Sequence, residues 1–600
     1  MDDTLIAHLP PPFNYYRLIS DSDHLHFGLW PEGRDDLSVE KALENMFARL
    51  VQYLPRPPAR ILDVGCGLGL SAHILRSSGY AVTAIAPSEV LIDYAEKRYG
   101  QDGVDFIVLN YFDDDPACFS KARYDALFFQ ESLQYLHPLS RVMERARFLL
   151  KDRGVMVIGD EVCYDACLKS ETSIHSARKI YAALSEKGFV VTENRKLGKQ
   201  VLPTCDVACT RLTDRFEDIL SRLSDPDAED NLRFFLKGWQ KQKAWHHSGR
   251  LGYEIFAAKK DSFCIRPYIK GDEHELLPLF NEAFNTRRGL DHWYWKYQNN
   301  PYGAHRIGVG ISGEGDIVSQ YAGYPVPFCD TLSRPPKPVY FLTVHAGDTF
   351  THPKIRRMGL GKTGLLARTT FYYYAEFLEE FVPFAYGFNT AKIKKLGERY
   401  LGYRYGPPVT LWKRDRDAPL KAGSLLRKVW SGLKVEEVFS VDGEWDEFFD
   451  RVCPSYGFLV KRDAQYLKWR YLNCPDRPYR IFAVRKRGKL TGWGVFLPRD
   501  DGLLWGDALF DKDFPECVAV MLRRITDGYV TGAKTIEGWF SPTPGWWSGR
   551  LTSMGFEPAP EPDGLTLCYR TFSNAVMDSD SVAEKLDHSF YYTWGDSDLF

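Results

Sequence analysis

Segment 63–69 carries three glycines in a spacing suited to a ligand-binding loop, Asp63-Val64-Gly65-Cys66-Gly67-Leu68-Gly69. An apolar run precedes this segment and a helical pattern follows it. Glycine lets the backbone turn sharply and approach a ligand with no side chain between them. The start of a helix offers free N–H groups and a positive dipole end. The segment therefore predicts a ligand site, and its G-x-G-x-G spacing differs from the G-x-G-x-x-G of nicotinamide-binding loops.

A second turn combines glycine with basic residues, Arg356-Arg357-Met358-Gly359-Leu360-Gly361-Lys362. It lies between a strand-like run (339–353) and a helical run (363–378). Backbone N–H groups at a helix start converge on an anion, and basic side chains add charge-assisted hydrogen bonds. The turn therefore predicts a pyrophosphate site, with an unliganded basic surface turn as the alternative.

The elements that must position the first loop alternate between apolar runs and amphipathic helical patterns. Such alternation is typical of an α/β fold with a parallel sheet covered on both faces. The run 188–197 is predicted to close this sheet, and the residues from there to about 260 are predicted to include further helices. The predicted strands before that run are 59–66, 80–86, 104–110, 124–130 and 153–159.

From about residue 262 the chain repeats itself. The segment W-K-Y-Q-N-N-P at 295–301 matches W-R-Y-L-N-C-P at 469–475, and Gly347-Asp348 matches Gly506-Asp507. Several recurrences in the same order predict two copies of one fold. The predicted domains are 1–260, 262–415 and 436–574, with a basic connector at 416–435. Residues 575–600 are predicted to form a polar tail that docks on the surface.

The first loop resembles motif I of the class I S-adenosylmethionine (SAM) dependent methyltransferases, and the resemblance covers about residues 1–260. It implies a Rossmann-like, doubly wound domain that binds SAM. These enzymes often have an acid at the end of the second strand, where this chain has Ile85-Ala86-Pro87-Ser88, so Ser88 or Glu89 is the expected substitute. The residues that the resemblance assigns to the cofactor are Asp63, Gly65, Cys66, Gly67, Gly69, Ser88, Asn110, Tyr111 and Gln130.

The same resemblance places Glu131 beside the methyl-transfer site and Asp160 and Glu161 near bound substrate. A base is needed only if the nucleophile arrives protonated. Glu131 and His26 are the first candidates, with His24 and Glu161 as further ones. For each histidine a purely structural role is at least as common as a catalytic one.

The second turn resembles motif A of the GNAT acetyltransferases through Pro353, Arg356, Gly359 and Gly361, over about 262–415. The resemblance implies a GNAT-like α+β domain that binds acetyl-CoA or another acyl-CoA. The second copy lacks R-x-x-G-x-G and is expected to be a degenerate GNAT-like domain. The residues expected at the CoA are Thr351, Arg356, Arg357, Gly359, Leu360, Gly361 and Lys362.

Two residues of the first copy are candidates for acyl-transfer chemistry. Many GNAT enzymes have a tyrosine four residues before the closing glycine, where this chain has Glu398, so Tyr400 is the candidate general acid. Asp348 is the candidate base for an amine, and a buried, hydrogen-bonded carboxylate is the equal alternative.

Composition sets the remaining expectations. A formal net charge of -2 gives no reason to expect a nucleic-acid or membrane partner. Twelve cysteines in 600 residues suit a reducing, cytoplasmic compartment. The pairs Cys163/Cys167 and Cys205/Cys209 have a spacing open to zinc, but buried thiols are favoured and no metal is predicted.

The combined expectation is a bifunctional transferase that methylates and N-acylates a small amine-bearing metabolite or sugar precursor. A methyltransferase with a non-catalytic CoA-binding or scaffold half, and a polyketide-type loading module, are the alternatives. Oligomeric state stays open.

Overall fold

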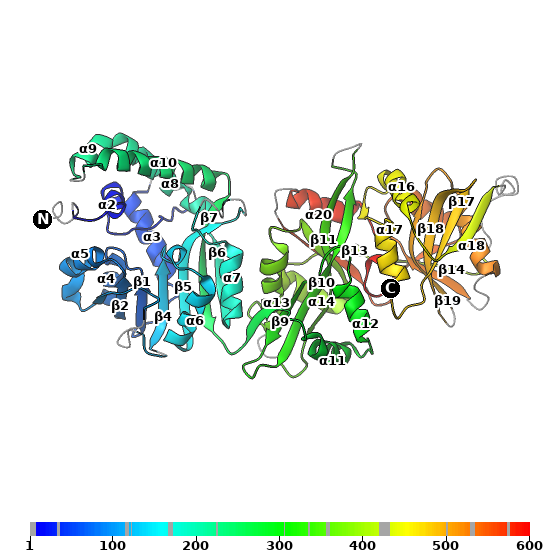
Figure 1. Cartoon of the computed structure of the whole chain (residues 1–600), viewed down its shortest axis with the longest axis horizontal. Coiled ribbons are helices and arrows are strands. Elements are labelled where there is room, and N and C mark those ends of the chain that lie inside the picture. Colours follow the sequence, from blue (N-terminus) through cyan, green and yellow to red (C-terminus); the bar gives the residue numbers. More distant parts are fainter. Residues whose placement is uncertain are drawn as a thin grey trace. The chain divides into compact units, whose positions relative to one another are not determined.

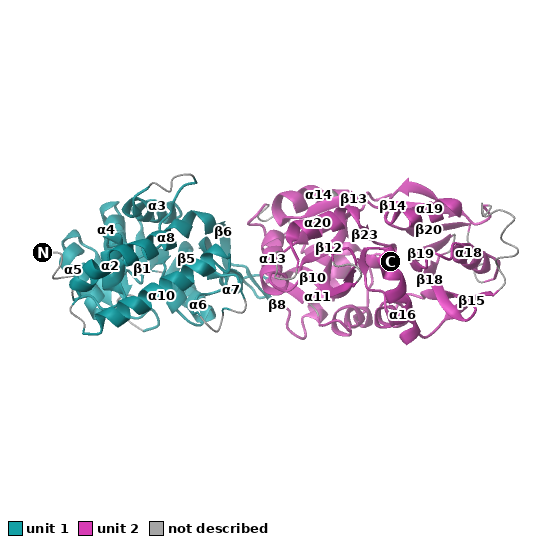
Figure 2. Cartoon of the chain, turned by 90° about the horizontal axis from the view of Figure 1, so that it is seen from above, with its two compact units in different colours: residues 1–266, 311–316 teal, residues 267–310, 317–600 magenta. Residues whose placement is uncertain are grey.

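A computed structural model gives the fold of the chain. It describes residues 6, 8–32, 37–113, 119–121, 123–165, 168, 172–223, 226–304, 306–333, 337–355, 361–418, 432–499, 502–528, 534–572 and 577–600. The chain forms two compact units (Figure 2), unit 1 with residues 1–266 and 311–316, and unit 2 with residues 267–310 and 317–600. None of the helices in these described ranges is long and apolar enough to cross a membrane.

Unit 1 is built on a seven-stranded sheet of order β3-β2-β1-β4-β5-β7-β6. The first five strands are parallel, and β7 runs antiparallel to both of its neighbours. This arrangement confirms the predicted Rossmann-like α/β fold. The strands are β1 (Arg60–Val64), β2 (Ala81–Ala86), β3 (Asp105–Val108), β4 (Tyr124–Gln130), β5 (Leu150–Cys163), β6 (Phe189–Lys196) and β7 (Leu251–Lys260).

The strand β7 is the one element of this sheet that the sequence prediction missed. The prediction placed only helices between about 198 and 260, whereas β7 inserts between β5 and the edge strand β6. Eight of its ten residues are buried in succession, because neighbouring strands and helices cover both faces. Without alternation of polar and apolar residues, such a strand gives no period-2 signal.

Helices cover both faces of the sheet and also form a cap at one end of it. In Figure 1, α2, α8, α9 and α10 lie together at that end of unit 1. The helices of the unit are α2 (Phe13–Ser20), α3 (Val39–Val51), α4 (Leu70–Ser77), α5 (Glu89–Tyr99), α6 (Leu139–Leu149), α7 (Ala177–Glu186), α8 (Gly198–Asp214), α9 (Phe216–Ser221) and α10 (Ala228–His247). Cys205 and Cys209 of α8 pack in the apolar core, and Cys167 lies outside the described residues.

Unit 2 contains two related sheets. The first has the path β13-β22-β12-β11-β10-β16-β23, with β9 paired to β10 and β8 paired to β9, and the second has the path β15-β17-β18-β19-β20-β14-β21. The run β13-β22-β12-β11-β10-β9-β8 corresponds to β21-β14-β20-β19-β18-β17-β15, and β16 and β23 are additions to the first sheet. The strands of the first are β8 (Cys264–Pro267), β9 (Arg306–Ile311), β10 (Ile317–Asp330), β11 (Val339–Thr351), β12 (Phe384–Asn389), β13 (Arg404–Pro408), β16 (Phe458–Val460), β22 (Thr566–Thr571) and β23 (Phe590–Tyr591). The strands of the second are β14 (Thr410–Asp415), β15 (Leu433–Val438), β17 (Arg480–Lys486), β18 (Lys489–Pro498), β19 (Gly502–Phe510), β20 (Thr535–Trp539) and β21 (Glu557–Pro560).

The two sheets share strands between the two halves of unit 2, and β16 and β23 of the second half join the first sheet. β14 follows β13 in the sequence but pairs with β20 and β21 of the second sheet. β22 follows β21 but pairs with β12 and β13 of the first sheet. Each half of unit 2 therefore completes the hydrogen-bond ladder of the other, so the two halves fold as one body.

Helices repeat in the same way around the two sheets. α11 and α12 precede β9 as α16 and α17 precede β17, α13 and α18 follow β11 and β19, and α14 and α19 follow β12 and β20. The helices are α11 (Glu273–Phe284), α12 (Leu290–Trp293), α13 (Leu365–Tyr373), α14 (Ala391–Leu396), α16 (Gly443–Val452), α17 (Ala464–Leu467), α18 (Glu516–Gly528), α19 (Gly545–Ser553) and α20 (Ser579–His588). One π-helical turn directly after α12 and another after α17 hold the repeated tryptophans.

Residues matched in the sequence repeat occupy equivalent positions. The rings of Trp295 and Trp469 stack with centroids 5.7 Å apart. Each indole N–H donates to the backbone carbonyl of the other residue, at 2.7 and 3.0 Å. The Tyr297 hydroxyl donates to Asp348 at 2.8 Å, and the Tyr471 hydroxyl donates to Asp507 at 2.7 Å.

The C-terminal segment lies inside unit 2, so the prediction of a tail docked on the surface is wrong. After α20, β23 pairs in parallel with β16. Trp594 stacks on Trp539 with centroids 4.6 Å apart. The Phe600 ring lies against Gly506, where a Cβ atom would stand 1.8 Å from it. The aromatic residues that end this polar segment are its anchors, which explains why average composition misled the prediction.

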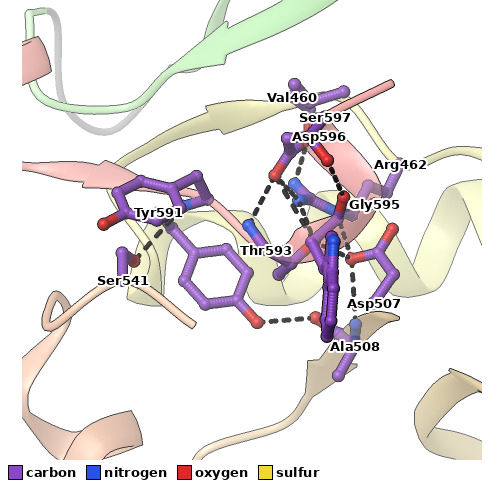
Figure 3. A network of polar contacts seen from close by, with 12 residues as sticks. Val460, Arg462, Asp507, Ala508, Ser541, Tyr591, Thr593, Gly595, Asp596 and Ser597 are labelled. Carbon is purple, nitrogen blue, oxygen red and sulfur yellow. Dashed lines mark hydrogen bonds and ion pairs between the residues drawn. The ribbon is translucent and has the colours of Figure 1, made fainter. Parts of the chain in front are cut away.

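A buried ion network fixes this segment (Figure 3). The guanidinium of Arg462 donates to Asp507 of β19 at 2.8 Å and also to Asp596. All three side chains are fully buried. The Thr593 hydroxyl donates to Asp507 at 2.9 Å, and the Thr593 N–H donates to Asp596 at 2.7 Å.

Loss of the Arg462 charge should destabilise unit 2, because it leaves two carboxyl groups buried without their cation. We expect Arg462→Met to lower the free energy of unfolding by about 3–5 kcal/mol. The measurement is urea denaturation followed by circular dichroism. Arg523→Met is the control, since Arg523 forms an exposed pair with Asp527. Equal denaturation midpoints for the two variants would contradict this role of Arg462.

Candidate functional site

A cavity of about 890 Å³ opens at the carboxyl ends of β1, β2 and β4. The helices α2, α8 and α10 supply its other wall. A volume in this range suits one or two small molecules. Its aromatic lining residues are Phe13, Tyr16, Phe27, Trp30, Tyr111, Tyr135, Phe234, Phe235, Trp239 and Trp245.

The glycine loop predicted from the sequence forms one end of this cavity. Gly65 has a φ of 77°, and a Cβ atom on it would lie 2.5 Å from the Cβ of Ser132. Gly69 has a φ of 88°, and a Cβ atom there would lie 2.6 Å from the Cβ of Ala95. Both conformation and space therefore require glycine at these positions, and α4 begins directly after the loop.

Several polar atoms around the loop are buried without a protein partner. They are Oδ2 of Asp63, Nε2 of Gln130 and Oγ of Ser132. The other amide atom of Gln130, Oε1, accepts a hydrogen bond from Ser71 at 2.8 Å. Burial raises the pKa of Asp63 to about 7. Buried polar groups are normally hydrogen-bonded, so this end of the cavity fits a ligand that carries both donors and acceptors.

The other residues expected at the cofactor, Cys66, Ser88, Asn110 and Tyr111, also line the cavity. Ser88 caps α5 by accepting a hydrogen bond from Leu91 N at 3.4 Å. The Tyr111 hydroxyl donates to Val142 O at 3.1 Å, so that group is occupied within the core. Burial raises the pKa of the Cys66 thiol, which therefore stays protonated.

Three carboxyl groups gather where β4 and β5 run side by side. Glu131 follows β4, and Asp160 and Glu161 lie in β5. Glu131 accepts a hydrogen bond from Phe27 N at 2.6 Å. Asp160 accepts from Leu133 N at 2.9 Å and from Gln134 N at 3.2 Å. Successive residues of a strand point to opposite faces, so Asp160 and Glu161 have separate environments.

Glu161 meets two side chains of α10. Nε2 of Gln242 donates to both carboxylate oxygens at 2.7 Å, and Nε2 of His246 lies 2.7 Å from Oε1. Glu161 and His246 are both buried, but only Glu161 and Gln242 line the cavity. The helix therefore presents a hydrogen-bonded carboxylate to the ligand space.

Burial controls the protonation of the remaining groups. Burial and the neighbouring Glu161 raise the pKa of Glu131 well above its usual range and that of Asp160 to about 8. Burial lowers the pKa of His24 to about 4, and burial together with His24 lowers that of His26 to about 3. At neutral pH both histidines are therefore neutral, and Glu131 and Asp160 carry protons.

The sequence prediction missed the contribution of α10. Phe235, Trp239, Gln242 and His246 recur at intervals of four, three and four residues, which places them on one face of the helix. This pattern was available in the sequence and indicates a buried face. It does not show that the face meets Glu161, because that contact depends on the tertiary fold.

The described residues predicted at the second site lie in two parts of unit 2. Thr351 lies at the end of β11, and Gly361 lies beside Tyr400. Thr351 is buried at the end of β11, and its hydroxyl lies 3.5 Å from that of Ser319. The Tyr400 ring lies 3.6 Å from where a Cβ atom of Gly361 would stand, and Lys362 is exposed. Arg356, Arg357, Gly359 and Leu360 lie outside the described residues.

Asp348 is a buried, ion-paired carboxylate, which disfavours the base role that the sequence suggested. It accepts hydrogen bonds at 2.7 Å from Arg288 and at 2.7 Å from Lys296, besides the one from Tyr297. Both cations hold its pKa far below the usual range. Such a carboxylate has little tendency to take a proton from an amine.

Comparison with known proteins identifies the first unit. A family model described as a methyltransferase domain matches residues 39–194. Residues 39–194 form a class I SAM-dependent methyltransferase domain. Over 193 residues the chain is 27% identical to a glycine/sarcosine/dimethylglycine N-methyltransferase of Actinopolyspora halophila, covering 31% of this chain and 33% of that protein. Over 213 residues it is 28% identical to an O-methyltransferase of Pyrenophora dematioidea, covering 32% of this chain and 79% of that protein.

One solved structure is similar to less than half of this chain. A cyclopropane synthase of Mycobacterium tuberculosis is 12% identical, with a TM-score of 0.37, and the match covers 43% of this chain and 99% of that one. The chain therefore spans a third of the length of the first relative above and most of the length of the other two proteins.

The stability of the methyltransferase domain should fall as pH rises from about 6.5 to about 8, because below about 6.5 the lowered pKa values of the buried His24 and His26 act in the opposite direction. Asp63 and Asp160 keep their protons to about pH 7 and 8 in the folded domain, whereas unfolded aspartates lose them near pH 4. The folded state binds more protons in this window, so raising the pH favours unfolding until both groups have ionised.

Urea denaturation at pH 5 to 9 measures this effect. Asp63→Asn and Asp160→Asn should each flatten the fall. Asp125→Asn is the control, because Lys151 and the Arg60 N–H, at 2.8 Å each, hold the pKa of Asp125 low. An unchanged pH slope in both test variants would show that these two groups ionise normally.

Proposed function

We propose that unit 1 transfers a methyl group from SAM to a small-molecule acceptor bound in the same cavity. The observation that carries this proposal is the division of the cavity. One end has the close-packed glycine loop with unpartnered polar atoms, and the other has the carboxyl cluster among aromatic rings. A donor and an acceptor can therefore meet in one water-poor space.

The residues present fit SAM. The Asp63 carboxyl is placed to receive the amino group of the methionine part, and that cation would favour its ionised form. The loop backbone at Gly65, Cys66 and Gly67 would lie along the same part, with Gly69 at the start of α4. Ser88, Asn110, Gln130 and the ring of Tyr111 would contact the remainder of the molecule. Bound SAM supplies an electrophilic methyl group on a sulfonium.

The chain's own contribution is positioning and exclusion of water. Holding a nucleophile in line with a methyl group can provide most of the acceleration of such a reaction. The aromatic wall keeps the space dry, and Glu131, protonated at neutral pH, can donate a hydrogen bond there. His26 is a neutral side chain that lines the cavity. Its Nδ1 lies 2.9 Å from Phe27 O, and its buried Nε2 has no protein partner, so Nε2 can accept a hydrogen bond from a bound ligand.

A methyl group added at Gly65 should abolish SAM binding. Gly65→Ala places a Cβ atom against Ser132, so we expect affinity measured by calorimetry to fall at least about a hundredfold. Gly79→Ala is the matched control, because Gly79 also has a positive φ, of 93°, but its nearest neighbour would be 3.5 Å away. Equal SAM affinity in the two variants would remove the loop from the donor site.

We further propose that the first half of unit 2, residues 262–415, binds an acyl-CoA, and that 436–574 is a degenerate second copy. The β11 and β12 strands pair at only two positions, Val344 with Ala385 and His345 with Tyr386. Past these positions β11 runs on to Thr351 and the basic turn before α13. Gly361 has a φ of 100° and lies beside Tyr400.

In this proposal a CoA pyrophosphate meets the backbone and side chains of Thr351, Arg356, Arg357, Gly359, Leu360, Gly361 and Lys362. Tyr400 is the group that protonates the departing thiolate, and the acceptor is an amine. The ion-paired Asp348 and the buried C-terminal segment favour the more limited alternative, in which unit 2 binds CoA or serves as a scaffold without acyl transfer.

Calorimetry with acetyl-CoA separates these options. We expect binding to the native chain and a loss of at least about tenfold in Arg356→Ala and in Gly361→Trp, because the anion loses a charge-assisted contact or its space. Lys512→Ala, an exposed residue elsewhere in unit 2, is the control. Absence of binding to the native chain would leave the scaffold role. Binding without acetyl transfer to any amine would support the non-catalytic alternative.

A further inference from the structure

We infer that the methyl acceptor is an amine on a largely apolar scaffold, bound as an ammonium against Glu161, which then takes its proton. The inference rests on the proposed methyl transfer and names the substrate class of that site. It is carried by the charges, hydrogen bonds and rings around Glu161.

The cavity carries acids but almost no cations. Its lining includes Asp23, Asp63, Glu131 and Glu161, and among these described lining residues Lys241 is the one lysine or arginine. The ammonium of Lys241 lies 4.5 Å from the ring centroid of Trp245. A carboxylate or phosphate on the acceptor would therefore meet no free cation near the carboxyl cluster, whereas an ammonium would meet an opposite charge.

Three of these four acids are not available to a cation of the acceptor. Asp23 is held by Arg17 at 2.6 Å and by Arg98 at 2.7 Å. Asp63 belongs to the glycine loop, and Glu131 is protonated at neutral pH. Glu161 is the acid left to meet a cation in the acceptor space.

The partners of Glu161 suit a carboxylate, which accepts hydrogen bonds at both of its oxygens. The amide nitrogen of Gln242 can only donate, and it contacts both oxygens of Glu161. A carboxylate accepts hydrogen bonds at both oxygens, whereas a carboxylic acid must spend one oxygen as a donor. Nε2 of His246 lies 2.7 Å from the same carboxyl group, and a neutral imidazole that carries its proton on Nε2 donates to a carboxylate there.

Aromatic rings complete an environment suited to an ammonium on an apolar body. The Phe27 ring lies 5.3 Å from His246 and 5.9 Å from Trp239. Tyr16 lies 6.2 Å from Trp239 on the other side. Ring faces attract a desolvated cation, and the apolar walls lower the pKa of a bound amine. Both effects act on an amine, and neither acts on an uncharged alcohol.

The proton balance follows from this arrangement. The bound ammonium, R–NH₃⁺, passes one proton to the Glu161 carboxylate and becomes R–NH₂. Its lone pair forms the N–CH₃ bond while the S–CH₃ bond breaks. The products are the methylated ammonium R–NH₂⁺–CH₃ and a neutral thioether, and Glu161 returns its proton to solvent when the product leaves.

Two probes that differ in one group test the inference, 2-phenylethylamine and 2-phenylethanol. Each is titrated by calorimetry into the full chain saturated with S-adenosylhomocysteine at pH 8. We expect the amine to bind at least about tenfold more tightly than the alcohol. Glu161→Gln should remove this preference and leave alcohol binding unchanged. Glu193→Gln, on the exposed part of β6, is the matched control.

Separate outcomes address the inference and the proposed function. SAM affinity measured on Glu161→Gln reports whether the variant still folds and binds the donor. The amine assignment is overturned if SAM binds but the alcohol binds as tightly as the amine. It is also overturned if Glu161→Gln still binds the amine more tightly than the alcohol. In both cases the proposed methyl transfer stands. If the native chain does not bind SAM, the proposed function itself fails.

Discussion

The parallel pairing of β1 with β4 and of β4 with β5 is the constraint on which the site depends. Parallel strands end at the same edge of a sheet. The loops after β1 and β4 therefore come together there, although they are far apart in the sequence. The close approach of Gly65 to Ser132 is the direct result, because these residues follow neighbouring strands. A side chain at Gly65 would collide with Ser132 and force the two loops apart.

The helical cap adds what the sheet cannot provide. The sheet edge supplies carboxyl groups, but a carboxylate buried alone would take up a proton. The α10 helix brings Gln242 and His246 to Glu161, whereas burial dominates at Glu131 and Asp160 and raises their pKa values. Three similar groups within a few residues of one edge therefore have different surroundings.

Unit 2 follows a different principle, because its two halves complete each other. Each sheet takes a strand from the other half, and the C-terminal segment adds Asp596 to the centre built on Arg462. In the first half, Asp598 lies 3.4 Å from Lys296. One short segment thus reaches the charged centres of both halves. Because this segment is buried, its carboxyl groups Asp596 and Asp598 neutralise the buried cations Arg462 and Lys296.

Local sequence patterns were enough to predict the alternation of strands and helices in unit 1, the glycine loop and the internal repeat. Each depends on local spacing, which the backbone geometry of a strand, a turn or a helix imposes directly. Trp295 and Trp469 could be matched because the two copies keep the same residues in the same order. The position of Asp63 and the glycines at a ligand cavity also followed from local pattern.

Contacts between residues that are distant in the sequence depend on the tertiary fold. His246 lies 85 positions from Glu161, and Asp596 lies 134 positions from Arg462. No local period relates such pairs, so the partner of Glu161, the exchanged strands and the buried C-terminal segment could not be predicted. The role of Asp348 belongs here too, because the same carboxylate is a base or an ion pair according to whether cations such as Arg288 and Lys296 reach it.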